Sequence, residues 1–71
     1  MNILLIEDDS TLNDTITDYL IFKGNQLTSL EDGGDAIKVI DKSNFDLYII
    51  DINVPQINGL QIVNYIRQKD L

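Results

Sequence analysis

The sequence predicts an α/β fold in which a three-stranded parallel sheet carries helices on both faces. Three observations predict it. Short apolar runs without helical periodicity, typical of strands, occur at residues 3–6, 26–30 and 45–50. Each is followed by a segment with apolar residues at helical spacing, at residues 11–23, 35–42 and 59–69. The connections are short, which favours parallel strands joined by right-handed crossovers.

The first unit begins with Ile3–Ile6, an apolar run that we expect to be buried on both faces of the sheet. Asp9 or Ser10 can cap the helix that follows, and Gly24 is its expected stop. The predicted packing face of this helix is made of Leu12, Ile16, Tyr19 and Leu20. The Tyr and Phe side chains are all interpreted as core residues.

The second unit is a weaker strand at Gln26–Leu30, a turn over residues 31–34, and a helix at Asp35–Lys42. The third has the strongest strand signal, Phe45–Ile50, which ends on Asp51. After the loop INVPQIN, the helix Gly59–Lys69 carries an apolar stripe of Leu60, Val63 and Ile66. The sequence therefore predicts the element order βαβαβα in a single small domain, residues 1–71.

Composition excludes several classes of function. The 12 acidic and 5 basic residues give a net charge of −7, which disfavours direct binding to nucleic acid. The absence of Cys and His excludes disulfides and the usual zinc sites, and leaves carboxylates as metal ligands. No apolar run is long enough to cross a membrane, and the N-terminus does not resemble a signal peptide. We therefore expect a cytoplasmic location.

Acidic residues follow two of the predicted strands. Glu7 and Asp8 come after the first strand and Asp51 after the third, so all three should lie at the carboxyl ends of parallel strands, where α/β sheets bind ligands. If the first and third strands are neighbours, the three carboxylates converge on one edge, and like charges so placed repel one another unless a cation lies among them. Mg²⁺, which prefers hard oxygen ligands, suits such a site. Asp51, the acid deepest against an apolar strand, is the candidate nucleophile toward phosphorus.

An alternative interpretation assigns the run EDDS to helix capping and to the helix dipole. We keep that interpretation for Asp9. For the other acids, the loop DINVPQING at residues 51–59 favours a metal site. Pro55 and Gly59 shape this loop, and it carries the backbone carbonyl of Asn53, a further hard-cation ligand, toward the same edge.

These motifs resemble the N-terminal part of a response-regulator receiver domain of bacterial two-component signalling. The resemblance rests on ILLIEDD, EDGGDAIKVI and FDLYIIDINVPQINGLQIVNYIR, and covers essentially all 71 residues. It implies that Asp51 accepts a phosphoryl group from a sensor histidine kinase. Asp8, Asp51 and the backbone carbonyl of Asn53 would bind Mg²⁺ directly, and Glu7 would assist in holding it through water. The implied protein is a signalling module rather than an enzyme, with a transcriptional regulator as its parent.

The resemblance also implies a flavodoxin-like fold of five βα units with strand order 2-1-3-4-5. The 71 residues contain the first three, in order 2-1-3, without the later Ser/Thr and Lys that contact the phosphoryl group in the family. The third strand then has an open edge, and we expect a dimer in which two such strands pair antiparallel. The alternative function is a non-signalling fragment that only folds and self-associates. A phosphatase of the haloacid dehalogenase type is disfavoured, because it needs Asp where Asn53 stands.

Overall fold

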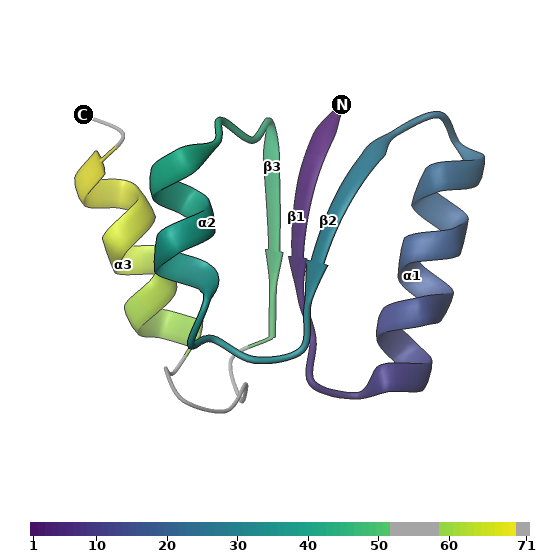
Figure 1. Cartoon of the computed structure of the whole chain (residues 1–71), viewed down its shortest axis with the longest axis horizontal. Helices are drawn as coiled ribbons and strands as arrows, with labels where there is room; N and C mark the ends of the chain where they lie inside the picture. The colour runs from purple at the N-terminus through teal and green to yellow at the C-terminus, as the bar shows by residue number, and fades with distance from the viewer. Residues whose placement is uncertain (52–58, 70–71) are drawn as a thin grey trace.

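The computed structural model describes residues 1–51 and 59–69. A parallel three-stranded sheet in the order β2-β1-β3 lies between helices on its two sides (Figure 1). The elements in chain order are β1 (Asn2–Ile6), α1 (Ser10–Phe22), β2 (Gln26–Leu30), α2 (Ala36–Lys42), β3 (Leu47–Ile50) and α3 (Gly59–Lys69). The predicted element order, the parallel pairing and the strand order are confirmed.

The central strand β1 pairs with both of the others. Leu4 lies opposite Thr28 of β2 and Tyr48 of β3, and Ile6 lies opposite Leu30 and Ile50. Because a central strand has no solvent face, Ile3, Leu4, Leu5 and Ile6 are all at most 1% exposed. The prediction that this run is buried on both faces is therefore correct.

The main hydrophobic core lies between the sheet and the helices α2 and α3. Side chains alternate between the two faces of a strand, so Leu4 and Ile6 point to this core. They pack there with buried residues of the two helices: Ala36, Ile40 and Ile62. Partly buried side chains surround this cluster, among them Phe45, Tyr48 and Tyr65. Ile3 and Leu5 point to the opposite face, where α1 lies (Figure 1).

Both ends of α1 have identifiable signals. Its N-cap is Asp9, whose side chain accepts a hydrogen bond from the Leu12 amide at 3.0 Å, so Asp9 rather than Ser10 caps the helix. Its C-terminal stop is Gly24, which has φ = +93° and donates its amide to the Ile21 carbonyl. A residue other than glycine adopts this backbone conformation only with strain, so Gly24 ends the helix as predicted.

The predicted packing face of α1 is partly wrong. Leu12 is 44% exposed and Tyr19 is 59% exposed. The buried member of the helix is Asn13, and the half-buried side chains Ile16, Thr17 and Leu20 continue its face at helical spacing. The apolar residues of α1 span a wider arc than one helix can bury against this sheet. The inward face is consequently rotated from the predicted one by about one position.

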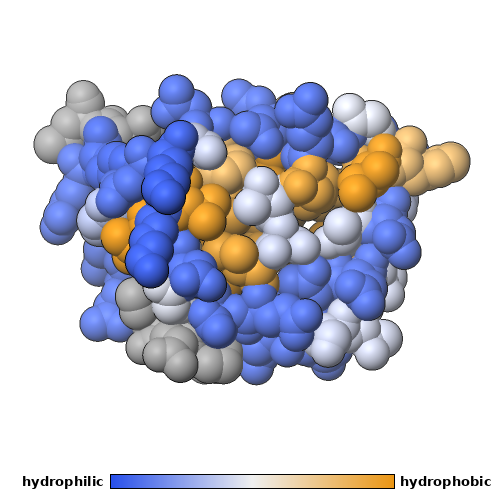
Figure 2. Space-filling view, in the orientation of Figure 1, coloured by the Kyte–Doolittle hydropathy of each residue, from blue (hydrophilic) through white to orange (hydrophobic). Residues whose placement is uncertain are grey.

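Two other predictions of burial are also wrong. Phe22, at the end of α1, is 84% exposed, so neither it nor Tyr19 is a core residue. In α3, Leu60 is 56% exposed, whereas Ile62 is fully buried and was not in the predicted stripe. Figure 2 shows the resulting surface: hydrophobic side chains gather over the middle of this face and at the upper right, where α1 ends.

A polar cluster joins α2 to α3. The Tyr65 hydroxyl donates to the Asp41 carboxylate at 2.5 Å, and the Lys69 ammonium lies 2.9 Å from the same oxygen. Lys69 also donates to the carbonyl of Ile40 at 3.3 Å. These contacts fix the two helices at the end of the sheet opposite the acidic residues (Figure 1). None of the helices in the described part of the chain is both long and apolar enough to span a bilayer.

Candidate metal centre

The three acidic residues singled out from the sequence lie at one edge of the sheet. β1 ends at Ile6 and β3 at Ile50, and these two residues are register partners. Glu7 directly follows β1 and Asp51 directly follows β3, and the Asp51 amide donates to the Ile6 carbonyl at 2.9 Å. The parallel ladder itself therefore places the two side chains next to each other.

One oxygen from each of Glu7, Asp8 and Asp51 lies within 4.8 Å of the other two. Asp8 is exposed, while Glu7 and Asp51 are half-buried. Within residues 1–51 and 59–69, the ion pair found is the one between Lys69 and Asp41, at the other end of the sheet. The group of carboxylates is therefore accessible from solvent at Asp8.

The pKa of Glu7 reflects this crowding. The hydrogen bond that the Asp9 amide donates to the Glu7 carboxylate, at 3.1 Å, lowers the pKa. Burial and the carboxyl groups of Asp8 and Asp51 act in the opposite direction and together prevail, so the pKa of Glu7 is raised. The protein without metal therefore holds a repulsion that a cation at this edge would relieve.

The donor set fits a hard divalent cation. All three groups offer carboxylate oxygens, the ligand type that Mg²⁺ and Ca²⁺ prefer over nitrogen or sulfur. The partial exposure of the group leaves room for the waters that Mg²⁺ keeps. The role of these residues as ligands stays a prediction that the geometry permits.

The other predicted site residues have different outcomes. Asn53 and Pro55 lie outside the described residues, so the expected carbonyl ligand and loop shape stay predictions. Gly59 is the first residue of α3 and is buried. Asp9, which was assigned to the helix entry, is the N-cap of α1 and also donates its amide to Glu7.

The sequence interpretation missed Asn13. It is 4% exposed, and its side-chain amide donates to the carbonyls of Glu7 and Leu30, both at 3.1 Å. The available signal was its spacing, because Asn13, Ile16, Thr17 and Leu20 follow the i, i+3, i+4, i+7 pattern of a buried helix face. A polar residue in such a pattern calls for hydrogen-bond partners inside the fold.

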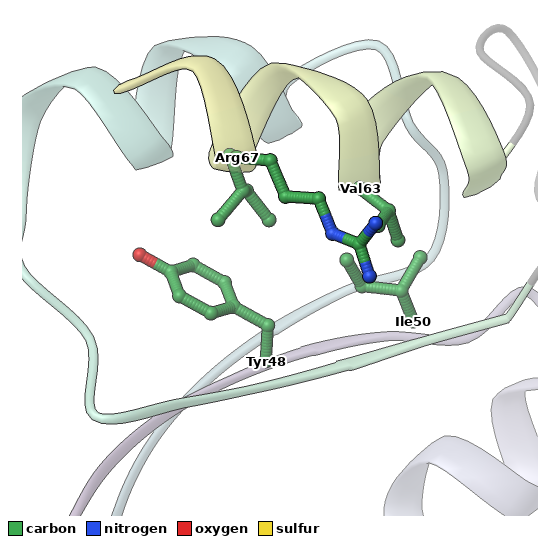
Figure 3. A pocket seen from close by; sticks show the side chains of 5 residues that line it. Tyr48, Ile50, Val63 and Arg67 are labelled. Atoms are coloured by element: carbon green, nitrogen blue, oxygen red, sulfur yellow. The ribbon is translucent and has the colours of Figure 1, made fainter. Parts of the chain in front are cut away.

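A hollow of about 300 Å³ lies between β3 and α3, lined by Tyr48, Ile50, Val63, Ile66 and Arg67. Figure 3 shows Tyr48 and Ile50 rising from β3 toward Val63 and Arg67 of α3. None of the three acidic residues lines it. Its lining is mostly apolar, so we assign it to packing and not to the chemistry of the acids.

Comparison with known proteins now defines the class. Residues 3–71 match the family model of the response regulator receiver domain. Transcriptional regulatory protein CssR of Bacillus subtilis is 38% identical over 68 residues, covering 96% of this chain and 30% of CssR. Response regulator TrrA of Thermotoga maritima, solved in complex with Mg²⁺–BeF, is 32% identical with a TM-score of 0.89, covering 96% of this chain and 59% of TrrA.

TrrA has also been solved in complex with the histidine kinase ThkA. The matched chain of that complex is 32% identical with a TM-score of 0.87, and the match covers 96% of this chain and 59% of the matched chain. The chain belongs to the response regulator receiver family. It spans about three fifths of the TrrA chain and less than a third of CssR.

Proposed function

We propose that this chain is the phosphoacceptor part of a receiver domain and that Asp51 accepts a phosphoryl group from a sensor histidine kinase. Glu7, Asp8, Asp51 and the backbone carbonyl of Asn53 would hold the Mg²⁺ that the transfer requires. The observation that carries the proposal is the approach of the three carboxylates to within 4.8 Å at the carboxyl edge of the sheet. The complexes of TrrA with Mg²⁺–BeF and with ThkA support it by similarity.

The chemistry assigned to Asp51 is nucleophilic. One carboxylate oxygen forms a bond to phosphorus while the bond from phosphorus to the donor breaks, and the donor leaves with the bonding electrons. Mg²⁺, when bound, neutralises charge on the transferring group. Glu7 and Asp8 would hold the cation beside Asp51. They form no bond to phosphorus. Because the phosphoryl group ends on the chain's own Asp51, the chain would act as a signalling module rather than as an enzyme.

The proposal extends to the whole protein. The 71 residues would be the first three βα units of a five-unit receiver, and the parent a transcriptional regulator in the manner of CssR. We also propose a cytoplasmic location, the compartment in which a kinase has access to ATP. With a net charge of −7, this segment is not expected to contact nucleic acid itself.

For the 71-residue polypeptide we further propose a two-fold dimer. In the described part of the chain, β3 pairs with β1 along one edge, and β3 is the outer strand of the sheet. Leu47 on this strand is 40% exposed, and the apolar hollow beneath α3 adjoins Tyr48 and Ile50 (Figure 3). An apolar edge strand is a template for a second strand. Antiparallel pairing of two β3 strands gives the sheet order 2-1-3-3′-1′-2′.

The phosphoacceptor proposal is tested by intact-mass spectrometry after incubation with acetyl phosphate and Mg²⁺. We expect a gain of one phosphoryl group, which disappears in Asp51→Asn and when EDTA removes the cation. An unmodified mass in the wild-type chain would overturn the proposal. Sedimentation tests the dimer separately, since a monomeric mass at micromolar concentration would contradict it. An unmodified mass together with a monomeric sedimentation mass would leave a chain that folds but neither accepts a phosphoryl group nor self-associates.

A further inference from the structure

Asn13 is a polar residue at a buried position of α1, where an apolar side chain would cost less free energy. It lies in the second turn of α1 and is buried, although asparagine is a poor helix former and burial of an amide without partners is unfavourable. The free-energy cost of burying the Asn13 amide is offset because both of its polar groups make hydrogen bonds. Nδ2 donates to two carbonyls, and Oδ1 accepts from the Thr17 hydroxyl at 3.3 Å.

The two carbonyls belong to the carboxyl ends of neighbouring strands. Leu30 ends β2, and its carbonyl also accepts the Glu7 amide at 3.0 Å. The Glu7 carbonyl is part of the peptide unit that joins Glu7 to Asp8, two of the three clustered acids. Asn13 therefore holds this peptide from α1, while the bond to Leu30 holds Glu7 from β2.

This anchoring acts at the point where regular structure ends. β1 ends at Ile6, the Glu7 amide makes one further bond to β2, and the helix starts only at Ser10. Residues 7–9 bridge the gap, and Asp9 is in turn fixed by its cap bond to the Leu12 amide. The direction in which Asp8 leaves the sheet thus depends on the orientation of the Glu7–Asp8 peptide, which Asn13 sets.

We propose that Asn13 is a positioning residue of the metal centre: it fixes the Glu7–Asp8 peptide and so sets the affinity of the acidic edge for a divalent cation. The inference rests on the proposed function, since it presupposes a cation at these acids. Loss of groups that orient metal ligands typically costs 10-fold to 100-fold in affinity. We expect Asn13→Leu, which is similar in size and donates no hydrogen bond, to weaken cation binding by roughly tenfold.

The test is a titration with Mn²⁺, whose free-ion electron paramagnetic resonance signal gives the bound fraction, with Mg²⁺ affinity from competition. Thr17→Val is a milder second variant, because it frees Asn13 Oδ1 but leaves both amide donations in place. We expect it to weaken binding by a few-fold. The matched control is Asn25→Leu: Asn25 also donates Nδ2 to a backbone carbonyl, that of Leu20 at 2.9 Å, but beyond the opposite end of α1.

Weaker binding in Asn13→Leu and Thr17→Val, with Asn25→Leu unchanged, is the expected result. If Asn13→Leu does not fold, Thr17→Val against Asn25→Leu decides the question. Wild-type affinity in the folded Asn13 and Thr17 variants would overturn the positioning role and leave the metal centre intact. An equal loss in Asn25→Leu would also overturn it, because stability alone would then explain the effect. A wild-type chain that binds neither Mn²⁺ nor Mg²⁺ would remove the metal centre and this inference together.

Discussion

The amide of Asp51 donates to the carbonyl of Ile6 at 2.9 Å, so the backbone at the end of β3 is bonded directly to the end of β1, one residue before Glu7. The candidate site is a direct consequence of strand order: with β3 next to β1, Asp51 and Glu7 leave the sheet side by side. In a sheet with β2 between them, they would be about two strand spacings, roughly 10 Å, apart. The predictions below test this dependence of the site on the fold.

Glu7→Gln should stabilise the protein in the absence of divalent cations. Because its pKa is raised in the folded state, Glu7 favours folding only while protonated, and this contribution is lost as the pH rises through the folded pKa. At pH 7 the neutral variant should have the higher melting temperature, measured by circular dichroism in EDTA. The difference should shrink as the pH falls into the acidic range, where wild-type Glu7 is protonated.

The matched control for that experiment is Asp18→Asn, which removes the same charge from an exposed position on α1. A similar gain in the control would attribute the effect to net charge rather than to the cluster. Added Mg²⁺ should raise the melting temperature of the wild-type chain but not of Glu7→Gln, since binding to the folded state stabilises it.

Asp41→Asn should weaken the contact between α2 and α3 in a pH-dependent way. The Tyr65 hydrogen bond and Lys69 lower the pKa of Asp41, so its contribution is present above its unfolded pKa and is lost as the pH falls through the folded value. The variant should melt below the wild type at pH 7 and match it in strong acid. Asp14→Asn, an equal charge change at an exposed site on α1, should not show this pattern.

Leu4→Ala should destabilise the fold by about 2–5 kcal/mol, the usual range for a buried leucine. Leu4 is fully buried in the core between the sheet, α2 and α3. Phe22→Ala removes a larger side chain but one that is 84% exposed, and we expect a change of about 0.5 kcal/mol or less. Urea denaturation of both variants checks the assignment of Leu4 to the core and of Phe22 to the surface. A larger loss of unfolding free energy in Phe22→Ala than in Leu4→Ala would contradict that assignment.

Local signals were sufficient for the element order and for placing each acid at the end of a strand, whereas the strand order 2-1-3 that brings the acids together followed from the resemblance to receiver domains. Apolar runs such as Ile3–Ile6 identify buried strands, and the residues that follow them must lie at the carboxyl edge of a parallel sheet. The predicted bounds of β2 and α3 match the structure, and those of the other elements differ by one or two residues.

The orientation of the helices could not be predicted in the same way. α1 has apolar residues on more than one side, and which side faces inward depends on where the helix rests on the sheet. Leu12 and Tyr19 consequently lie outside, while Asn13 lies inside. The burial of Asn13 is explained by its partners, the carbonyls of Glu7 and Leu30, which only the folded chain brings within reach.

The central claim is that Asp51, at the edge shared with Glu7 and Asp8, accepts the phosphoryl group. The most direct measurement is to phosphorylate the chain with acetyl phosphate and Mg²⁺, reduce the acyl phosphate with borohydride, and locate the converted residue by peptide mass spectrometry. Reduction of an aspartyl phosphate yields homoserine. We predict homoserine at position 51 and at no other aspartate, and its appearance at Asp8 or Asp9 instead, or at none, would contradict the account.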